Sequence, residues 1–183
     1  DVYKRQTLRL MTNYQEGVRM QLLSRLAYRD GLTDLLNRTS YMEELKRLDA
    51  SHNFHVLLAL YDVNSLKYVN DTYGHQSGDE MIRRVADTLS AHLGSLGKCY
   101  RIGGDEFVFL STVSDSEKEF LKLQRDFEAS LGTLKLPDGS EHPITVAMGY
   151  SVLTHTMPRS MDDMVREADA KMYEAKRRMK TEN

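Results

Sequence analysis

The sequence predicts an α+β fold with a ferredoxin-like βαββαβ core, in which helices flank a central antiparallel sheet, preceded by one long N-terminal helix. Two observations support this prediction. Short apolar runs of strand length alternate with longer segments whose apolar residues recur at helical spacing. Two of the short runs are separated only by a glycine pair and an acid, which is typical of a hairpin. Counted from Phe54, the expected order is strand, helices, hairpin, helix, strand, helix.

The N-terminal helix is expected over residues 1–29, and Gly31 ends it. Its apolar residues recur at near-helical spacing, with Arg and Gln between them. They are Leu8, Met11, Val18, Leu22 and Leu26. A helix with one apolar stripe and no domain of its own usually packs on a partner. We therefore interpret residues 1–29 as a linker and dimerisation helix that carries a signal from an upstream sensor domain. The alternative is a helix folded back on the domain formed by residues 30–183.

The first core elements surround a buried strand. A helix capped by Asn37 or Thr39 comes first, and the apolar run Phe54–Asp62 then predicts a central strand. A short helix over Ser65–Tyr73 is broken by Gly74 and leads into a longer helix. The apolar face of that longer helix is Met81, Ile82, Val85, Leu89 and Leu93.

The remaining elements complete the βαββαβ order. In chain order they are a strand over Cys99–Ile102, a strand over Glu106–Leu110, a helix over Ser116–Leu131, a turn at Pro137–Gly139, a strand over Ile144–Leu153 and a helix over Ser160–Lys180. The buried stripe of the last helix is expected to be Met161, Met164, Val165, Ala168, Met172 and Tyr173.

Composition excludes several classes of protein. The 183 residues are 40% hydrophobic and 28% charged, with a formal net charge of −2. These values are ordinary for a globular domain and argue against a nucleic-acid-coating surface, so an anionic substrate needs a local site. The single Cys99 indicates a reducing compartment and is expected to be a buried structural thiol. No membrane-length apolar run or signal-peptide pattern is present, which favours a cytoplasmic location. The start at Asp1 indicates a fragment of a longer protein, which can be anchored in a membrane upstream.

Acidic residues gather where two predicted strands end. Asp62 closes the central strand, and Asp105-Glu106 lie in the turn after Gly103-Gly104. If the hairpin pairs beside the central strand, the carboxylates of Asp62 and Asp105 converge. Mg²⁺ prefers oxygen ligands from a few carboxylates and from substrate phosphates, so this convergence predicts a magnesium site.

Polar residues are dense between the central strand and the next long helix. Lys67, Asn70, His75 and Asp79 lie there, and an Asn with an Asp can pair with the edge of a guanine. The last helix ends in a basic cluster made of Lys171, Lys176, Arg177, Arg178 and Lys180. Each feature alone has an ordinary structural explanation. Asp79 can cap a helix, His75 can be a loop histidine, and cations suit a helix C-terminus.

Taken together, these motifs resemble the GGDEF family. The matching segments, in order, are Asp30–Arg38 (the family's DxLTxLxNR), Asp62–Asp79 (its metal and guanine segment), Arg101, Gly103–Phe107 (its signature) and Ala168–Lys176 (its ADxALYxAK). The match spans residue 30 to about residue 180. Four ordered motifs at the family's spacing are much more specific than the five-residue signature alone.

The resemblance implies a diguanylate cyclase with a palm-type core. Such an enzyme condenses two GTP into cyclic di-GMP and releases two pyrophosphates, using two Mg²⁺ per site, with Mn²⁺ able to substitute. By similarity, Asp62, Asp105 and the carbonyl of Val63 bind metal. Asp105 is the candidate catalytic acid or base with Glu106 beside it, and Lys67 stabilises charge in the transition state.

The resemblance also implies a substrate-binding set. Asn70 and Asp79 match the guanine-reading pair, and His75 occupies a neighbouring substrate position. The phosphates would be bound by backbone groups and basic side chains. The remaining members assigned to the substrate are Ser65, Leu66, Arg101, Lys176 and Lys180.

Each domain would hold one GTP, so catalysis would require a homodimer in which each copy contributes half of the catalytic centre. No nucleic-acid partner is expected. The first alternative is a catalytically silent GTP-binding module that regulates a neighbouring domain. A cyclase that makes a mixed adenine–guanine product is a second alternative, which Asp79 disfavours because a carboxylate suits guanine's donors. The third is a dimerising scaffold that binds no nucleotide.

The sequence departs from the family at three places. Asn64 replaces a common Asp near the metal positions. Residues 94–97 hold no RxxD where many relatives carry an inhibitory product site, so we predict no inhibitory RxxD site there. The same spacing at Arg84–Asp87 and Arg166–Asp169 falls within predicted helices and is interpreted as surface pairing. The last helix ends Arg177–Lys180 without the common GRN.

Overall fold

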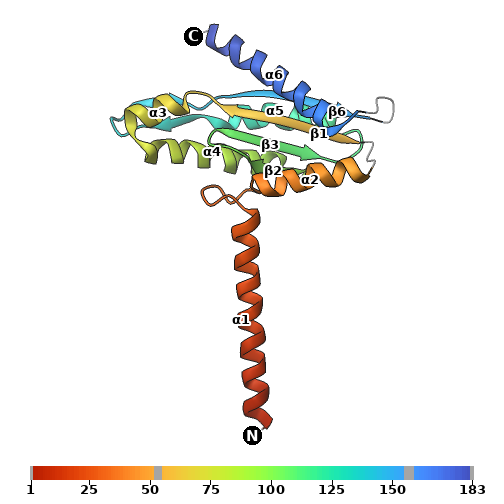
Figure 1. The fold of residues 1–183 in the computed structure, drawn as a ribbon. Helices are drawn as coiled ribbons and strands as arrows, with labels where there is room; N and C mark the ends of the chain where they lie inside the picture. The colour runs from red at the N-terminus through yellow and green to blue at the C-terminus, as the bar shows by residue number, and fades with distance from the viewer. Residues whose placement is uncertain (1, 52–54, 155–158, 182–183) are drawn as a thin grey trace.

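The computed structural model describes residues 2–51, 55–154 and 159–181. Its centre is a four-stranded antiparallel sheet in the order β2-β3-β1-β6 (Figure 1). The strands are β1 (Val56–Val63), β2 (Lys98–Arg101), β3 (Glu106–Ser111) and β6 (Val146–Leu153). This arrangement confirms the predicted α+β fold with helices around a central antiparallel sheet.

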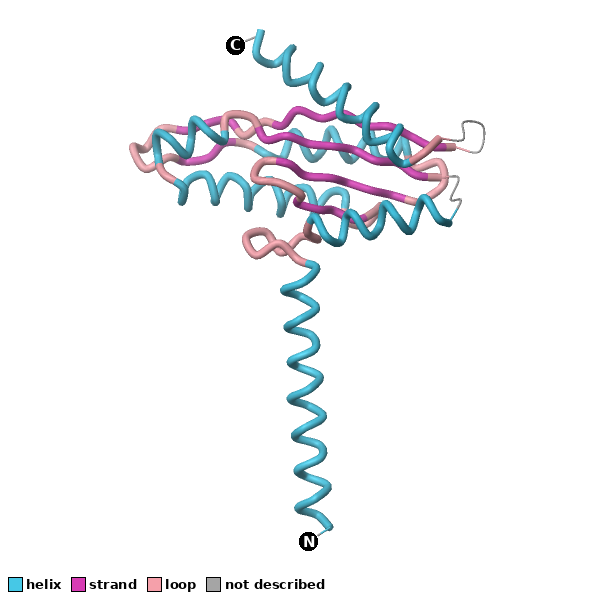
Figure 2. Tube along the Cα trace, viewed as in Figure 1, coloured by secondary structure: helices cyan, strands magenta, loops and turns pink. Residues whose placement is uncertain are grey.

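Two helical layers cover the sheet, as the tube view in Figure 2 also shows. One face packs against α2 (Arg38–Ser51) and α6 (Met161–Thr181), and the other against α4 (His75–Leu93) and α5 (Glu117–Leu131). A short helix, α3 (Leu66–Tyr73), connects β1 to α4. Because both sheet faces are covered, the central strand is buried along its whole length.

Strand β1 shows how its sequence produces this arrangement. All eight of its residues are buried, as expected for a strand between two helical layers. Leu58 and Leu60 join the core on the α2/α6 side, whereas Leu57, Ala59 and Tyr61 join the core on the α4/α5 side. The buried Tyr61 hydroxyl donates a 2.7 Å hydrogen bond to Gln124 Oε1 of α5, so its polar group is satisfied.

Helix α6 approaches β6 very closely at Gly149. A β-carbon at this position would lie 2.1 Å from the Ala168 carbonyl oxygen and 2.2 Å from the Met172 nitrogen. The predicted stripe is buried at Met161, Met164, Ala168 and Met172 and partly buried at Val165. Tyr173, predicted to be buried, is 62% exposed. It follows Met172 by one residue, so it is rotated about 100° away from the sheet-facing stripe.

Helix α1 (Val2–Tyr28) projects away from the domain (Figure 1). The large apolar side chains that it presents are 39–83% exposed: Tyr3, Leu8, Leu10, Met11, Tyr14, Val18, Met20, Leu22, Leu23, Leu26 and Tyr28. The alternative of a helix folded back on its own domain is therefore wrong. The division of the chain at residues 29 and 30 into a linker and a catalytic domain stays a prediction.

Most predicted elements are present, with boundaries shifted by a few residues. Asn37 caps α2, because its Oδ1 accepts a 3.1 Å hydrogen bond from the Ser40 amide. Phe54, the predicted start of the first strand, lies outside the described residues. The free Cys99 is buried, as expected, and burial raises the pKa of its thiol to about 12. Within the described residues, no helix is both long and apolar enough to cross a membrane.

A second hairpin was not predicted. It pairs β4 (Thr133–Lys135) with β5 (Glu141–Pro143) and places the expected Pro137–Gly139 turn at its tip. Gly139 adopts φ 85°, a conformation that glycine accepts without strain. Strands of three residues are too short to show an alternating pattern, which is why only the turn was recognised.

Replacing Gly149 by alanine should destabilise the domain, because the new methyl group would meet backbone atoms of α6 that cannot move independently. We expect Gly149→Ala to lower the free energy of unfolding by about 1–3 kcal/mol, the usual cost of overpacking. Urea unfolding followed by circular dichroism measures this change. Gly31→Ala is the control, since a β-carbon added there would meet no atom of another described residue, its chain neighbours aside, within 4 Å. Equal stabilities of the two variants would contradict the close approach.

Candidate functional site

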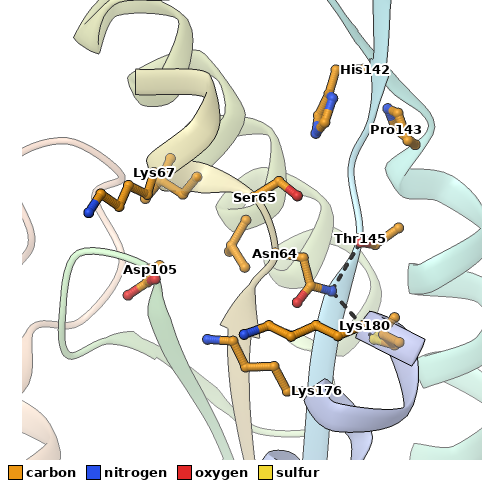
Figure 3. Close-up of a pocket in the computed structure, with 12 residues that line it drawn as sticks. Asn64, Ser65, Lys67, Asp105, His142, Pro143, Thr145, Lys176 and Lys180 are labelled. Carbon is orange, nitrogen blue, oxygen red and sulfur yellow. Dashed lines mark hydrogen bonds between the residues drawn. The ribbon is translucent and has the colours of Figure 1, made fainter. Parts of the chain in front are cut away.

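A cavity of about 770 Å³ opens at the end of β1, between the start of α3 and the C-terminal part of α6 (Figure 3). It combines an acidic side chain with several basic ones. Its lining is Val63, Asn64, Ser65, Leu66, Lys67, Asp105, His142, Pro143, Thr145, Lys176, Met179 and Lys180. Seven of these residues belong to the predicted site: Val63, Ser65, Leu66, Lys67, Asp105, Lys176 and Lys180.

The hairpin turn lies directly beside the end of β1. Asp62 is the register partner of Glu106, and the Val63 amide donates a 2.9 Å hydrogen bond to the Asp105 carbonyl oxygen. The expected pairing of the hairpin with the central strand is therefore present. It brings the backbone that carries Asp105 next to the strand end that carries Asp62.

The Asp62 carboxylate already binds a cationic group. Lys176 Nζ donates hydrogen bonds of 2.7 Å to each of its two oxygens, and the Asp62 side chain is only 11% exposed. A carboxylate buried this far needs a positive partner. The Asp105 backbone is close to this strand end, and Asp105 and Val63 line the main cavity, whereas Asp62 is not among its lining residues. Carboxylate and carbonyl oxygens of this kind are the ligands that a hard divalent cation prefers.

Substrate oxygens and water would have to complete any metal coordination. Within the described ranges, no group of three or more His, Cys, Asp or Glu side chains is arranged to hold a metal ion. Mg²⁺ usually binds through one or two carboxylates together with phosphates and water. The residues present therefore suit a metal that arrives with a phosphorylated substrate.

Helix α3 presents its N-terminus to the cavity. Ser65 precedes it with a left-handed backbone (φ 62°, ψ 9°), and Leu66 is its first residue. Amide groups in a first helical turn have no intrahelical acceptor and favour anions. Lys67 follows and extends on the same side of the cavity as Asp105 (Figure 3).

Two further lysines come from α6. Lys176 and Lys180 are four residues apart, so they lie one turn apart on the same helix face, and both line the cavity. With Lys67, the cavity holds three ammonium groups, which act as point-charge binders of phosphate. The arrangement suits a ligand with several negative charges.

The predicted guanine-reading residues lie together but outside this cavity. The Asn70 side chain packs on Gly78, where an added β-carbon would lie 1.9 Å from Asn70 Oδ1, and Asp79 is the next residue. His75 is exposed in the first turn of α4. The α3–α4 corner thus groups Asn70 and Asp79, and their role with guanine stays a prediction.

Arg101 makes structural contacts and does not line the cavity. Its Nη1 donates to both carboxylate oxygens of Asp30 at 3.0 and 3.2 Å, and its Nη2 donates to the Gly104 carbonyl oxygen at 2.9 Å. Arg101 therefore joins the glycine turn to the loop after α1. Its predicted contact with substrate stays a prediction.

Asp30 organises the loop after α1. Its Oδ1 also accepts hydrogen bonds from the Thr33 amide at 2.9 Å and the Thr33 hydroxyl at 2.7 Å. Burial raises the pKa of Asp30, but hydrogen bonds from Thr33 and Arg101 outweigh burial and hold that pKa below its ordinary value of 3.8. The carboxylate is therefore stabilised in its charged form.

Glu106 faces a different cavity. As the register partner of Asp62 it points to the α2/α6 side, where it lines a second cavity of about 410 Å³ between α2 and α6. This position separates Glu106 from the cavity that Asp105 lines. Its assignment as a catalytic residue stays a prediction.

Five residues that line the main cavity were not expected there from the sequence: Asn64, His142, Pro143, Thr145 and Met179. Asn64 Nδ2 donates to Thr145 Oγ1 at 3.0 Å and thereby links β1 to the segment before β6. His142 belongs to the unpredicted hairpin, and its ring lies 5.9 Å from that of Tyr68. For His142 and Pro143, the recognised turn at 137–139 was the signal that could have revealed the hairpin that carries them.

Comparison with known proteins identifies the family. The family model described as "Diguanylate cyclase, GGDEF domain" matches residues 27–182. The chain belongs to the GGDEF domain family. The GGDEF domain is 32% identical over 161 residues to the protein named diguanylate cyclase DgcN of Escherichia coli K12. It is 30% identical over 152 residues to diguanylate cyclase DosC of the same strain. These matches cover 84% and 81% of this chain but only 38% and 33% of those relatives.

Solved structures agree with this family assignment. The coiled coil and GGDEF domain of DgcB from Caulobacter crescentus, in complex with c-di-GMP, superpose with a TM-score of 0.78 at 30% identity. That match covers 93% of this chain and 92% of the other. The structure of diguanylate cyclase SiaD from Pseudomonas aeruginosa, in complex with its activator SiaC, gives a TM-score of 0.72 at 27% identity. That match covers 94% of this chain and 68% of the other.

The Asp30 contacts predict a pH-dependent contribution to stability. Because the pKa of Asp30 is lowered on folding, its contribution is present above the ordinary value of 3.8 and is lost as the pH falls through the folded-state pKa. We expect Asp30→Asn to lower the free energy of unfolding by about 1–3 kcal/mol at pH 7. The difference from the unmodified domain should narrow towards pH 3.

Urea titrations at a series of pH values measure this difference. Asp34→Asn is the matched control, because Asp34 pairs with Arg25 on the surface, where both side chains are more than half exposed. It should change stability by less than about 0.5 kcal/mol. A loss for Asp30→Asn that is the same at pH 3 and pH 7 would contradict the proposed role of its charge.

Proposed function

We propose that this GGDEF domain is an active diguanylate cyclase that condenses two GTP into cyclic di-GMP and releases two pyrophosphates. The observation that supports this proposal most strongly is one cavity in which Asp105 and three lysines meet beside Asp62. Carboxylates suit a divalent cation, and ammonium groups suit a triphosphate. The intact Gly103–Phe107 signature agrees with this function.

Asp62, Asp105 and the Val63 carbonyl would hold Mg²⁺, with two ions per site and Mn²⁺ as a substitute. When bound, these ions would activate the attacking 3′-hydroxyl and stabilise the leaving pyrophosphate. Asp105 would hold or accept the hydroxyl proton, and Glu106 would assist from the neighbouring strand position. Lys67 would stabilise the charge that develops on the transferred phosphate.

The remaining predicted residues would bind GTP. The backbone amides of Ser65 and Leu66 lie at the start of α3 beside the cavity, which supports a phosphate contact. Lys176 and Lys180 would neutralise the triphosphate from α6. The guanine would lie towards the α3–α4 corner, where Asn70, His75 and Asp79 would contact it. Arg101 would act on the substrate through the position of the glycine turn.

Catalysis would require two copies of the domain. Each site would hold one GTP, and the 3′-hydroxyl of one GTP must reach the α-phosphate of the other. The exposed apolar side chains of α1 support a dimerisation helix that connects to an upstream sensor domain. The DgcB structure is described as a coiled coil and GGDEF domain, which agrees with this arrangement. We place the domain in the cytoplasm, where GTP is available.

The second candidate function is a catalytically silent GTP-binding module that regulates a neighbouring domain. The silent module would have the same fold and the same phosphate site as the active cyclase, so an assay for cyclic di-GMP is needed to distinguish the two functions. The intact pair Asp105-Glu106 favours the enzyme, because loss of catalysis removes the need to keep both acids.

Incubation of the domain with GTP and Mg²⁺, followed by chromatography, tests the activity. We expect cyclic di-GMP to form, and Asp105→Ala to reduce its rate by about 10²–10⁴-fold, as expected for loss of a proton-transferring and metal-binding group. Asp87→Ala is the control, because Asp87 is exposed on α4 away from the cavity. Absence of product under forced dimerisation, with GTP still bound, would instead support the silent module.

Substitutions on α1 test the dimer. Val18→Lys combined with Leu22→Lys places charges on the apolar stripe, so the specific activity should fall at low protein concentration and recover at high concentration. Sedimentation velocity measures the dimer in parallel. Gln6→Lys combined with Asn13→Lys adds the same charge on another face of α1 and should change neither quantity. Unchanged dimerisation and activity in the first variant would rule out this role for the stripe.

A further inference from the structure

Lys176 takes the place that a chelated cation would occupy at Asp62. Its Nζ lies 2.7 Å from both carboxylate oxygens, so it sits astride the carboxylate. The Asp62 side chain is 11% exposed and the Lys176 side chain 32% exposed, so the carboxylate is shielded from water and the ammonium group is partly shielded. Such an ammonium group satisfies the buried carboxylate that the GGDEF domain is proposed to offer to metal.

We infer that Lys176 is a positioning residue with two alternating partners: it holds Asp62 until a divalent cation binds there, and it then binds the phosphates of the nucleotide. This inference rests on the proposed function and extends it, because it makes metal binding and nucleotide binding interdependent.

Competition for Asp62 follows from electrostatics. A divalent cation held by Asp62 would compete with the Lys176 ammonium group, which already contacts both carboxylate oxygens. If Lys176 remained in contact with the same carboxylate, two positive charges would lie a few ångströms apart where screening by water is weak. The cation therefore displaces Lys176, and Lys176 weakens the binding of a metal that arrives alone.

The displaced ammonium group can turn into the main cavity. The Lys176 side chain lines the main cavity together with Lys180 and Lys67, where the phosphates are proposed to bind. Helix α6 itself is held by its close contact with Gly149, so the four-carbon stem of Lys176 can turn while the helix stays in place. A change of side-chain rotamer is then sufficient to exchange the carboxylate for a phosphate.

Because Lys176 has two partners, the Asp62 carboxylate and the phosphates, it affects metal affinity and nucleotide affinity in opposite directions. It opposes the binding of metal alone, and it favours the binding of nucleotide once metal is present. Coupling between two ligands is reciprocal, so bound nucleotide also increases the affinity for metal. Lys180 lines the same cavity, but no contact between it and Asp62 is present among the described residues. It is therefore a matched control that shares only the phosphate role.

A titration of the full chain with Mn²⁺ in the absence of nucleotide tests the inference. The electron paramagnetic resonance signal of free Mn²⁺ measures how much metal remains unbound. We expect Lys176→Met to bind Mn²⁺ about tenfold more tightly than the unmodified chain, within the range typical of coupling between sites. Lys180→Met should leave this affinity unchanged. With saturating Mn²⁺, both variants should bind a non-hydrolysable GTP analogue more weakly.

Unchanged or weaker Mn²⁺ affinity in folded Lys176→Met would overturn the inference, because removal of a lysine that does not compete with the metal for Asp62 produces no gain in affinity. Circular dichroism checks the fold. If the methionine variant does not fold, Lys176→Gln replaces it, since a neutral amide can still donate to Asp62. The outcome is independent of cyclase activity. Unchanged Mn²⁺ affinity together with cyclic di-GMP synthesis would reject only the role of Lys176, whereas no synthesis with tighter Mn²⁺ binding would reject only the cyclase.

Discussion

The antiparallel pairing of β1 with β3 is the constraint on which the rest of the structure depends. It sets Asp62 opposite Glu106 and ties the Val63 amide to the Asp105 carbonyl oxygen. A shift of one residue would turn every side chain of β1 to the opposite helical layer, which two separate cores forbid. Packing of the apolar residues therefore fixes the position of the acidic ones.

The charged groups near the sheet end depend on one another in a similar way. Asp62 is nearly buried and is matched by Lys176, while Arg101 is matched by Asp30 and the Gly104 carbonyl. Each pair joins segments distant in sequence: α6 to β1, and the loop after α1 to the glycine turn. Breaking one member of such a shielded pair leaves the other uncompensated, so these contacts specify the local geometry as well as the chemistry.

The sequence was sufficient to predict the fold and the strand pairing that brings the Asp105 backbone next to the end of β1. Leu57–Leu60 form one uninterrupted apolar run, and Met81 to Leu93 recur at helical spacing, so both patterns report burial directly. The resemblance to the GGDEF family supplied the assignments of Lys67 and Lys176, both of which line the cavity. For these residues, a local pattern or motif contains the necessary information.

Other features depend on tertiary contacts that no local pattern records. His142 reaches the cavity through a hairpin of three-residue strands, too short for a periodic signal. Arg101 was assigned to substrate, yet its guanidinium contacts Asp30, 71 residues earlier in the chain. The ion pair of Lys176 with Asp62 spans 114 residues. Long cationic side chains can reach several acceptors, and only the folded chain decides which one they take.

The connection between α1 and the domain is held by several hydrogen bonds. The α2 start holds the last turn of α1: Asn37 Nδ2 donates to the Ala27 carbonyl oxygen at 2.8 Å, and Ser40 Oγ donates to that of Tyr28 at 2.7 Å. Asp30, two residues after the helix, is tied through Arg101 to the glycine turn. Since α1 is about 40 Å long, it is a lever with a stiff hinge. We therefore expect a rotation or tilt of the N-terminal end of α1 to be transmitted to the edge of the sheet through these hydrogen bonds.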